Sequence, residues 1–127
     1  HLGSMTLDPS FLNSNATVVD LTLSATATYG TNARKSIPGT FPTQALWAGD
    51  VTFNKQLKYA GSNNDRDPIL TAIGGLVPTN TLSGQYRQED INMNGQVKYA
   101  GSANDRDILL QNIGGSVPTA TRNAQLP

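Results

Sequence analysis

Two short segments of the chain carry apolar residues at helical spacing. These apolar positions fall on one face of a helix in each segment: Ile69, Leu70, Ile73, Leu109, Leu110 and Ile113. The spacing predicts helices over 65–73 and 105–113. The pairs Gly74-Gly75 and Gly114-Gly115 predict where the helices end, because glycine adopts the left-handed backbone of a C-terminal cap. Helices of about two to three turns are marginal alone, so packing or a ligand must stabilise them.

A strictly alternating pattern occupies the N-terminal third. Apolar residues alternate with Thr, Ser and Asp from Val19 to Tyr29, which predicts one β-strand. Residues 30–42 are rich in turn-forming residues. The segment 41–47 is predicted to form a second strand. The tail after Thr121 is expected to be extended.

An internal repeat organises the rest of the chain. Residues 50–81 align with 90–121 at a constant offset of 40 without a gap, and 20 of the 32 aligned pairs are identical. Two copies are too few for a solenoid, which needs about three to bury a continuous core. We therefore expect the copies to pack face to face as a pseudo-symmetric pair.

Each copy consists of a polar loop followed by one of the predicted helices. Asp65 and Asp105 stand at the helix starts, where a carboxylate can accept hydrogen bonds from free backbone N–H groups. Asp67 and Asp107 fall in the first turn and suit the positive end of the helix dipole. They are also candidate partners for the adjacent arginines, Arg66 and Arg106.

The composition excludes several kinds of chemistry. The 127 residues contain no cysteine and one histidine, His1. The segment 1–5 is typical of the remnant of an affinity tag and is set aside. Without native cysteine or histidine, thiolate zinc sites, metalloproteases and Ser-His-Asp hydrolases are excluded, and we expect no enzymatic activity.

Charge and polarity narrow the expected partners and location. Nine Lys and Arg balance nine Asp and Glu, which gives no basic footprint for nucleic acid. No run of about 18 apolar residues occurs, so no membrane insertion is expected. Ser, Thr and Asn make up 35 residues, and this uncharged polarity suggests an exported protein, extracellular or at the cell surface.

The second loop has the oxygen-rich spacing of a calcium site. Ca²⁺ takes six to eight oxygen ligands, which alternate residues of a tight loop can aim at one point. Gly95 permits the turn, and a carboxylate at the start of the next helix closes the shell, with Asp107 as the reserve for that position. The expected ligands are Asp90, Asn92, Asn94, the backbone of Gln96 and Asp105.

The first loop repeats the pattern with two changes. Thr52 replaces the third-position Asn, and Lys55 replaces the glycine. A side chain at the glycine position strains the backbone of the sharp turn. A second Ca²⁺ site is therefore expected to be the weaker one or to be lost. Its ligands would be Asp50, Thr52, Asn54, the backbone of Gln56 and Asp65.

The duplicated motif resembles the calcium-binding loop–helix repeats of the dockerin family, in a variant found in secreted or surface proteins of Bacteroidetes-type bacteria. The resemblance covers about 47–127 and includes the closing Gln125-Leu126-Pro127. It implies two Ca²⁺ ions and paired helices that dock onto a protein partner, either cohesin-like or a surface component. Seven residues separate Val97 from Asp105, where the usual dockerin loop has three. Asp105 and Asp107 therefore both remain candidates for the closing ligand, as do Asp65 and Asp67 in the first loop.

These observations predict a small, mainly α fold. It would be a dockerin-like, pseudo-two-fold pair of calcium-loop–helix motifs over 47–127, preceded by a strand or hairpin segment over 6–46. The expected function is a calcium-binding protein-interaction module. The alternatives are a structural C-terminal spacer or anchor and, third, a carbohydrate-binding module.

The residues singled out above also have simpler, purely structural interpretations. Asp, Asn and Gly clusters are often simple turns, because their side chains satisfy local backbone groups. Trp47 is expected to be a core anchor rather than a sugar platform. Tyr59 and Tyr99 are expected to pack between the repeats, although an exposed pair would suit a binding hot spot.

Overall fold

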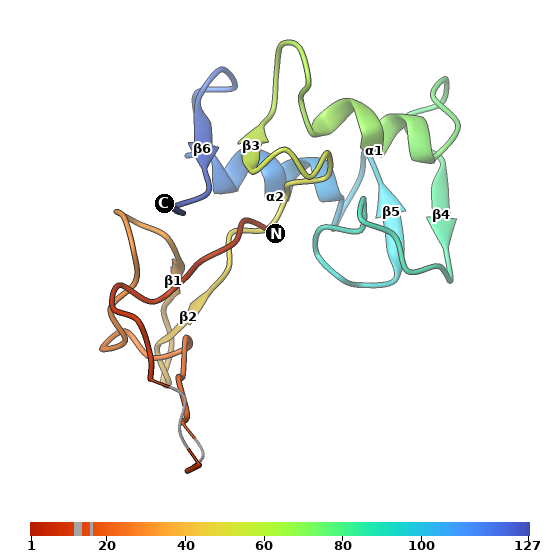
Figure 1. Cartoon of the computed structure of the whole chain (residues 1–127). Coiled ribbons are helices and arrows are strands. Elements are labelled where there is room, and N and C mark those ends of the chain that lie inside the picture. The colour runs from red at the N-terminus through yellow and green to blue at the C-terminus, as the bar shows by residue number, and fades with distance from the viewer. Residues whose placement is uncertain (12–13, 16) are drawn as a thin grey trace. The chain divides into compact units, whose positions relative to one another are not determined.

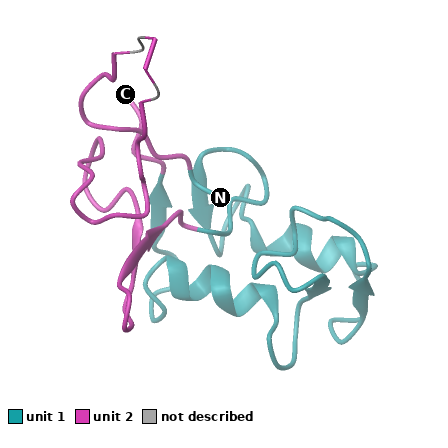
Figure 2. Cartoon of the chain, turned by 90° about the horizontal axis from the view of Figure 1, so that it is seen from below, with its two compact units in different colours: residues 1–2, 48–123 teal, residues 3–47, 124–127 magenta. Residues whose placement is uncertain are grey.

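The computed structural model describes residues 1–11, 14–15 and 17–127. Two compact units are present, which Figure 2 colours separately: His1–Leu2 with Ala48–Asn123, and Gly3–Trp47 with Ala124–Pro127. The first unit contains both copies of the repeat and is called the repeat unit below. The second is called the N-terminal unit.

The expectation of a mainly α fold is wrong. Helix accounts for 12% and strand for 18%, the latter in small antiparallel sheets. The physical reason is local: a Gly-Gly pair stops each helix after two turns, and the segments on either side of each helix pair as short strands. The fold is a small mixed one in which helices and two-stranded ribbons alternate along the chain (Figure 1).

The two predicted helices are present at nearly the expected bounds, as α1 (Arg66–Ala72) and α2 (Asp105–Asn112). Gly74 and Gly75 end α1 with positive φ, and their N–H groups donate to the carbonyls of Thr71 and Leu70. The second Gly-Gly pair ends α2 with the same hydrogen bonds. This pattern satisfies the free carbonyls of a helix end. No helix among the described residues is long and apolar enough to cross a membrane.

The strands of the repeat unit exchange partners between the two copies. Strand β3 (Gln56–Lys58) of the first copy pairs with β6 (Thr121–Asn123), which ends the second. Strand β5 (Gln96–Lys98) of the second copy pairs with β4 (Thr81–Ser83), which ends the first. Figure 1 shows these two ribbons. Helix α1 of the first copy contacts β5 of the second, and α2 of the second copy contacts β3 of the first. Each helix therefore packs against a strand of the other copy.

Equivalent residues of the two copies form the core of the repeat unit. The fully or nearly fully buried pairs are Val51 and Ile91, Leu57 and Val97, Ile69 and Leu109, and Ile73 and Ile113. Leu2, from the segment set aside above, is also buried. Gly49 lies against this core, and a Cβ there would stand 3.0 Å from Leu109 Cδ1. The two copies of the repeat therefore contact each other through α1, α2, β3 and β5.

The N-terminal unit contains one hairpin, β1 (Lys35–Ile37) with β2 (Thr43–Ala45). The strand predicted over 19–29 is wrong, because 21–26 forms turns. Asp20 accepts hydrogen bonds from the N–H and hydroxyl of Thr22. The Arg34 guanidinium donates to carbonyls in the same turns, at residues 21, 23 and 26. These side chains offer the backbone an alternative to a strand ladder.

Candidate functional site

The two loops that carry the predicted calcium ligands have the same backbone. Positive φ occurs at equivalent non-glycine positions, 55° at Phe53 and 59° at Met93. Lys55 has a φ of 66° where its counterpart, Gly95, has 82°. The first loop therefore keeps its shape by placing a lysine in the left-handed region, which L-residues occupy at a cost.

Asp50 and Asp90, the first residues of the loops, organise the loop backbone. Asp50 accepts hydrogen bonds from the N–H groups of Asn54 at 3.0 Å and Lys55 at 3.1 Å. Asp90 accepts the equivalent bonds from Asn94 at 3.1 Å and Gly95 at 2.8 Å. Each carboxylate oxygen thus receives one N–H and keeps further acceptor capacity, because an ionised carboxylate has about four lone-pair sites.

Asp65 and Asp105 lie beneath the loops, and neither caps its helix. Both are fully buried. Asp65 Oδ1 accepts from the N–H groups of Val51 and Thr52 and from the Thr52 hydroxyl, and its Oδ2 accepts from the Lys58 N–H. Because its carboxylate faces the loop, the predicted cap hydrogen bond is absent at Asp65.

Asp105 makes the same connection in the second copy. Its Oδ1 accepts from the N–H groups of Ile91 at 2.8 Å and Asn92 at 3.2 Å, and its Oδ2 accepts from the Lys98 N–H at 2.9 Å. Burial is the main cause that raises the pKa of both Asp65 and Asp105, and the N–H donors oppose it. Each loop therefore closes over its own buried carboxylate.

The helix caps are Asn64 and Asn104, which the sequence analysis did not assign. Asn64 Oδ1 accepts from the Asp67 N–H, and its amide donates to Asp67 Oδ2. Asn104 makes the same pair of bonds with Asp107. An asparagine immediately before the helical stripe was the signal for these caps, since Asn is as good an N-cap as Asp.

Asp67 and Asp107 form the predicted pairs with the adjacent arginines, Arg66 at 2.8 Å and Arg106 at 3.1 Å. The Asn64 amide and then Arg66 lower the pKa of Asp67, and the corresponding groups lower that of Asp107. The Arg66 guanidinium lies 5.2 Å from the centre of the Tyr59 ring. Arg106 lies 5.1 Å from the Tyr99 ring. Both tyrosines are half-buried.

The remaining predicted ligands lie within the loops and are held by local hydrogen bonds. In the second loop, Asn92 Oδ1 accepts from the Asn94 N–H and Asn94 Oδ1 from the Gln96 N–H. In the first loop, Asn54 Oδ1 accepts from the Gln56 N–H. Gln56 and Gln96 begin β3 and β5. Each loop therefore brings together its predicted oxygens, with Asp65 or Asp105 behind them.

Carboxylates are sparse in each loop. Each loop holds one pair, Asp50 with Asp65 or Asp90 with Asp105, and no group of three or more metal-ligating His, Cys, Asp or Glu side chains occurs within 1–11, 14–15 and 17–127. The members of a pair lie close enough for the charge of one to raise the pKa of the other. A cation bound here would therefore depend largely on amide, hydroxyl and backbone oxygens.

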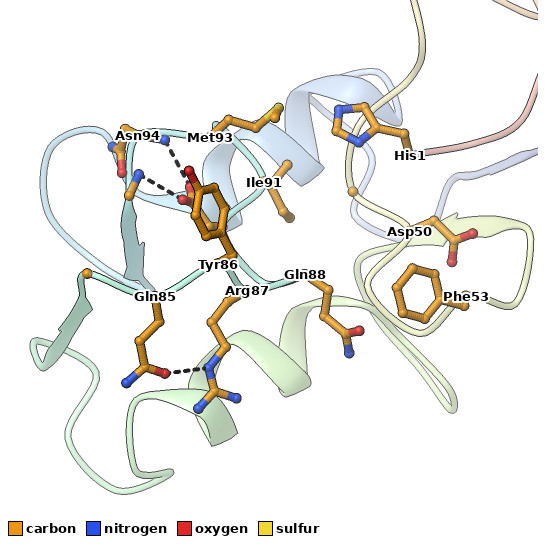
Figure 3. A pocket seen from close by; sticks show the side chains of 14 residues that line it. His1, Asp50, Phe53, Gln85, Tyr86, Arg87, Gln88, Ile91, Met93 and Asn94 are labelled. Atoms are coloured by element: carbon orange, nitrogen blue, oxygen red, sulfur yellow. Dashed lines mark hydrogen bonds between the residues drawn. The ribbon is translucent and has the colours of Figure 1, made fainter.

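A hollow of about 670 Å³ in the repeat unit is lined by both loops and by residues 84–88. Figure 3 shows Phe53 beside Asp50 on one side, with Tyr86 and Met93 on the other. Phe53 is 68% exposed and Met93 76% exposed. The sequence analysis missed these side chains. The available signal was an apolar residue at the same exposed loop position of both copies.

Trp47, in the N-terminal unit, is partly exposed, and its Nε1 donates to the Asn32 carbonyl at 2.8 Å. It is therefore anchored by its polar edge rather than enclosed in a core.

Comparison of the chain with protein-family models, with curated proteins and with solved structures finds no match. The function of the chain must be inferred from the chemistry of its own residues.

Proposed function

We propose that the repeat unit is a calcium-binding module whose role is to bind another protein. The observation that carries this proposal is the placement of Phe53 and Met93. Both loops hold a large apolar side chain in solvent on a left-handed backbone. Strained backbone and exposed apolar surface each cost free energy, and both are typical of binding sites.

The side chains around the hollow suit a protein surface. Phenylalanine, tyrosine and methionine are enriched at protein interfaces, and methionine adapts its shape to its partner. Phe53 and Met93 lie on loops tied to the buried carboxylates of Asp65 and Asp105, so these loops are already ordered before a partner arrives. Preorganisation of this kind reduces the entropic cost of binding.

The same surroundings argue against catalysis. The two carboxylates in the hollow, Asp50 and Asp90, accept backbone N–H groups on both oxygens. These bonds commit both carboxylates to holding the loop backbone. A general acid or base needs a free proton-transfer position within reach of a substrate. Binding without chemistry is the simpler role for this surface.

Calcium is the proposed cofactor of the loops, with the stronger site in the second. Asp50 and Asp90 keep acceptor capacity on each oxygen, and the loop amides lie beside them. A bound cation would also offset the repulsion between the paired carboxylates. Because few ligands are charged, we expect dissociation constants of about 10⁻⁴–10⁻³ M, the range of extracellular calcium modules. An extracellular or cell-surface location would supply enough calcium.

The binding role can be tested with a double variant. We expect wild-type protein immobilised on beads to retain one or more proteins from a secreted-protein extract of the source organism. The variant Phe53→Ser with Met93→Ser should lose them, because the apolar contacts are gone. Phe41→Ser is the control, since Phe41 is also an exposed apolar residue but lies in the N-terminal unit. Identical retention by all three proteins would contradict the proposal.

The calcium role needs a separate measurement. Calorimetric titration of Ca²⁺ should give a weak site that Asp90→Asn removes and Asp50→Asn affects less. Binding should release protons at a pH near the raised pKa of Asp105, because a cation favours the ionised carboxylate. An unchanged thermal midpoint in EDTA and in millimolar calcium, together with no heat of binding, would eliminate calcium without eliminating the protein-binding role.

A further inference from the structure

The second loop contains the one asparagine of the sequence that is followed by a glycine, Asn94 with Gly95. Both residues are exposed. The side-chain amide of an asparagine can be attacked at Cγ by the backbone nitrogen of the next residue, which closes a succinimide ring. Glycine favours this attack because it has no Cβ to crowd the nitrogen. The chain therefore has one position where this reaction is sterically open.

The first loop supplies a matched position where the same attack is hindered. Asn54 is exposed like Asn94, and its Oδ1 accepts a hydrogen bond from the Gln56 N–H at 2.9 Å. Asn94 Oδ1 accepts the equivalent bond, also at 2.9 Å. The residue after Asn54 is Lys55, whose φ of 66° keeps the shape of the loop while its side chain crowds the backbone nitrogen. The two asparagines thus have matching contacts and differ in the residue that follows.

Hydrogen bonds of the closed second loop engage both reacting groups. The Gly95 N–H, whose nitrogen would attack, donates to Asp90 Oδ2 at 2.8 Å. The Asn94 N–H donates to the other oxygen of the same carboxylate at 3.1 Å. Because the attacking nitrogen loses its proton, ring closure breaks the bond to Asp90 Oδ2, so the closed loop opposes the reaction. An exposed loop opens locally at a lower free energy than the whole protein unfolds, and the folded chain can therefore still react.

We propose that Asn94 is a site of spontaneous deamidation, which the second loop slows while it is closed. The Gly95 nitrogen forms a bond to Asn94 Cγ and gives up its proton to water. The bond from Cγ to Nδ2 breaks, and Nδ2 takes up a proton and leaves as ammonia. Water then opens the succinimide ring at either of its carbonyl carbons. The products are an aspartate or an isoaspartate at position 94, and each carries a new carboxylate.

The modification changes the loop that carries Met93. Its new carboxylate adds negative charge to the loop that Asp90 organises, and an isoaspartate also lengthens the backbone by one atom between 94 and 95. Both changes weaken the hydrogen bonds that Asp90 accepts from this stretch of backbone. An effect on partner binding would rest on the proposed function of the loops, whereas the reaction itself does not.

The test compares the two loops in one sample. Wild-type protein is incubated in EDTA near neutral pH, and deamidation at each asparagine is followed by mass-spectrometric peptide mapping. We expect Asn94 to react about tenfold or more faster than Asn54, because the residue after Asn94 has no Cβ. Lys55→Gly should make Asn54 as reactive as Asn94, and Gly95→Lys should suppress the reaction at Asn94. Gly95→Lys is compatible with the loop, since the first loop already holds a lysine there.

A second comparison tests the control of the rate by the closed loop. A synthetic peptide of residues 88–98 lacks Asp105 and the rest of the repeat unit, and it serves as the open-loop reference. It should deamidate about tenfold or more faster than the folded chain, because the folded loop must first open. Asp90→Ala removes the acceptor of the Gly95 N–H and should move the rate at Asn94 towards that of the peptide. Thermal unfolding checks that this variant is folded.

Three results would overturn the proposal. They are equal rates at Asn94 and Asn54, no reaction at Asn54 after Lys55→Gly, and a folded chain that reacts as fast as the peptide. A folded Asp90→Ala variant that reacts as slowly as wild type would also overturn it. If Asp90→Ala does not fold, the comparison of wild type with the peptide decides the same point.

Discussion

Asp105 and Lys98 are joined by a hydrogen bond of 2.9 Å, in which the Lys98 N–H donates to the carboxylate Oδ2. Asp65 and Lys58 make the same bond at the same length in the first copy. Each buried aspartate therefore ties the start of its loop, the following strand and the helix to one carboxylate. The loops do not need an ion for this connection, whether or not they bind one.

Replacing a buried aspartate should destabilise the repeat unit with or without metal. Asp105→Ala leaves three backbone N–H groups without their acceptor, and each unsatisfied buried group costs about 1–3 kcal/mol. We expect a loss of about 3 kcal/mol or more in the free energy of unfolding, measured by urea denaturation in EDTA. Asp107→Ala, at an exposed position, should lose much less. Equal stability of Asp105→Ala and wild type in EDTA, with a difference that arises only in calcium, would show that Asp105 acts as a metal ligand instead.

Replacing an asparagine cap should lower the free energy of unfolding by less than replacing a buried aspartate. Asn104 Oδ1 accepts the free N–H of Asp107 at 2.9 Å, and Asn64 does the same in α1. Asn104→Ala should therefore cost about 1 kcal/mol. Asn104→Asp should also destabilise the protein near neutral pH, because a carboxylate replaces the amide that donates to Asp107 Oδ2 at 2.8 Å. Thermal melts of the two variants check this, and an Asp variant as stable as wild type would show that the amide donation contributes little.

Much of the repeat unit could be predicted from its sequence, because local rules decide it. The apolar spacing at Ile69 and Leu109 and the Gly-Gly pairs locate both helices, and the offset of 40 predicts a paired architecture. The three-residue strands could not be predicted, since periodicity needs longer segments. The pairing of strands from different copies depends on contacts between residues far apart in the sequence, which a local pattern does not reveal.

The calcium ligands named from the sequence stay a prediction, and the contacts of two of them differ from those expected. The loop residues expected to bind calcium do gather in each copy, but the direction of Asp65 and Asp105 could not be read from spacing. An aspartate beside a helix start can turn toward the helix or toward the loop, and here the adjacent asparagine takes the cap. Similarly, the alternation at 19–29 was overridden by the Asp20 and Arg34 side chains.

Acidification should remove the contribution of the exposed first-turn aspartates. The Asn64 amide and Arg66 lower the pKa of Asp67 below its usual value of 3.8. Its ionised form then favours folding above 3.8, and this contribution is lost as the pH falls through the lowered native pKa. The double variant Asp67→Asn, Asp107→Asn should be less stable than wild type near neutral pH. The difference should shrink below 3.8, as measured by urea denaturation at stepped pH.

Asp65 and Asp105 act in the opposite direction. Because burial raises their pKa, the native state binds protons more tightly than the unfolded chain between 3.8 and the raised values. Their contribution to stability therefore increases as the pH falls through that window. The comparison of the double variant with wild type cancels it, since both proteins keep Asp65 and Asp105. A stability difference that grew on acidification would contradict the lowered pKa of Asp67 and Asp107.

The exchanged strands predict that the two copies unfold as one. Ile69 of α1 is fully buried, and α1 contacts β5 of the other copy. Ile69→Ala should cost about 2–5 kcal/mol through the cavity it leaves. Native-state hydrogen exchange should then accelerate equally at the Lys58 and Lys98 amides, which lie in different copies. Leu76→Ala, at a highly exposed position of the first copy, should change neither rate. Faster exchange confined to one amide would mean that each copy folds independently, because a shared transition exposes both amides at the same free energy.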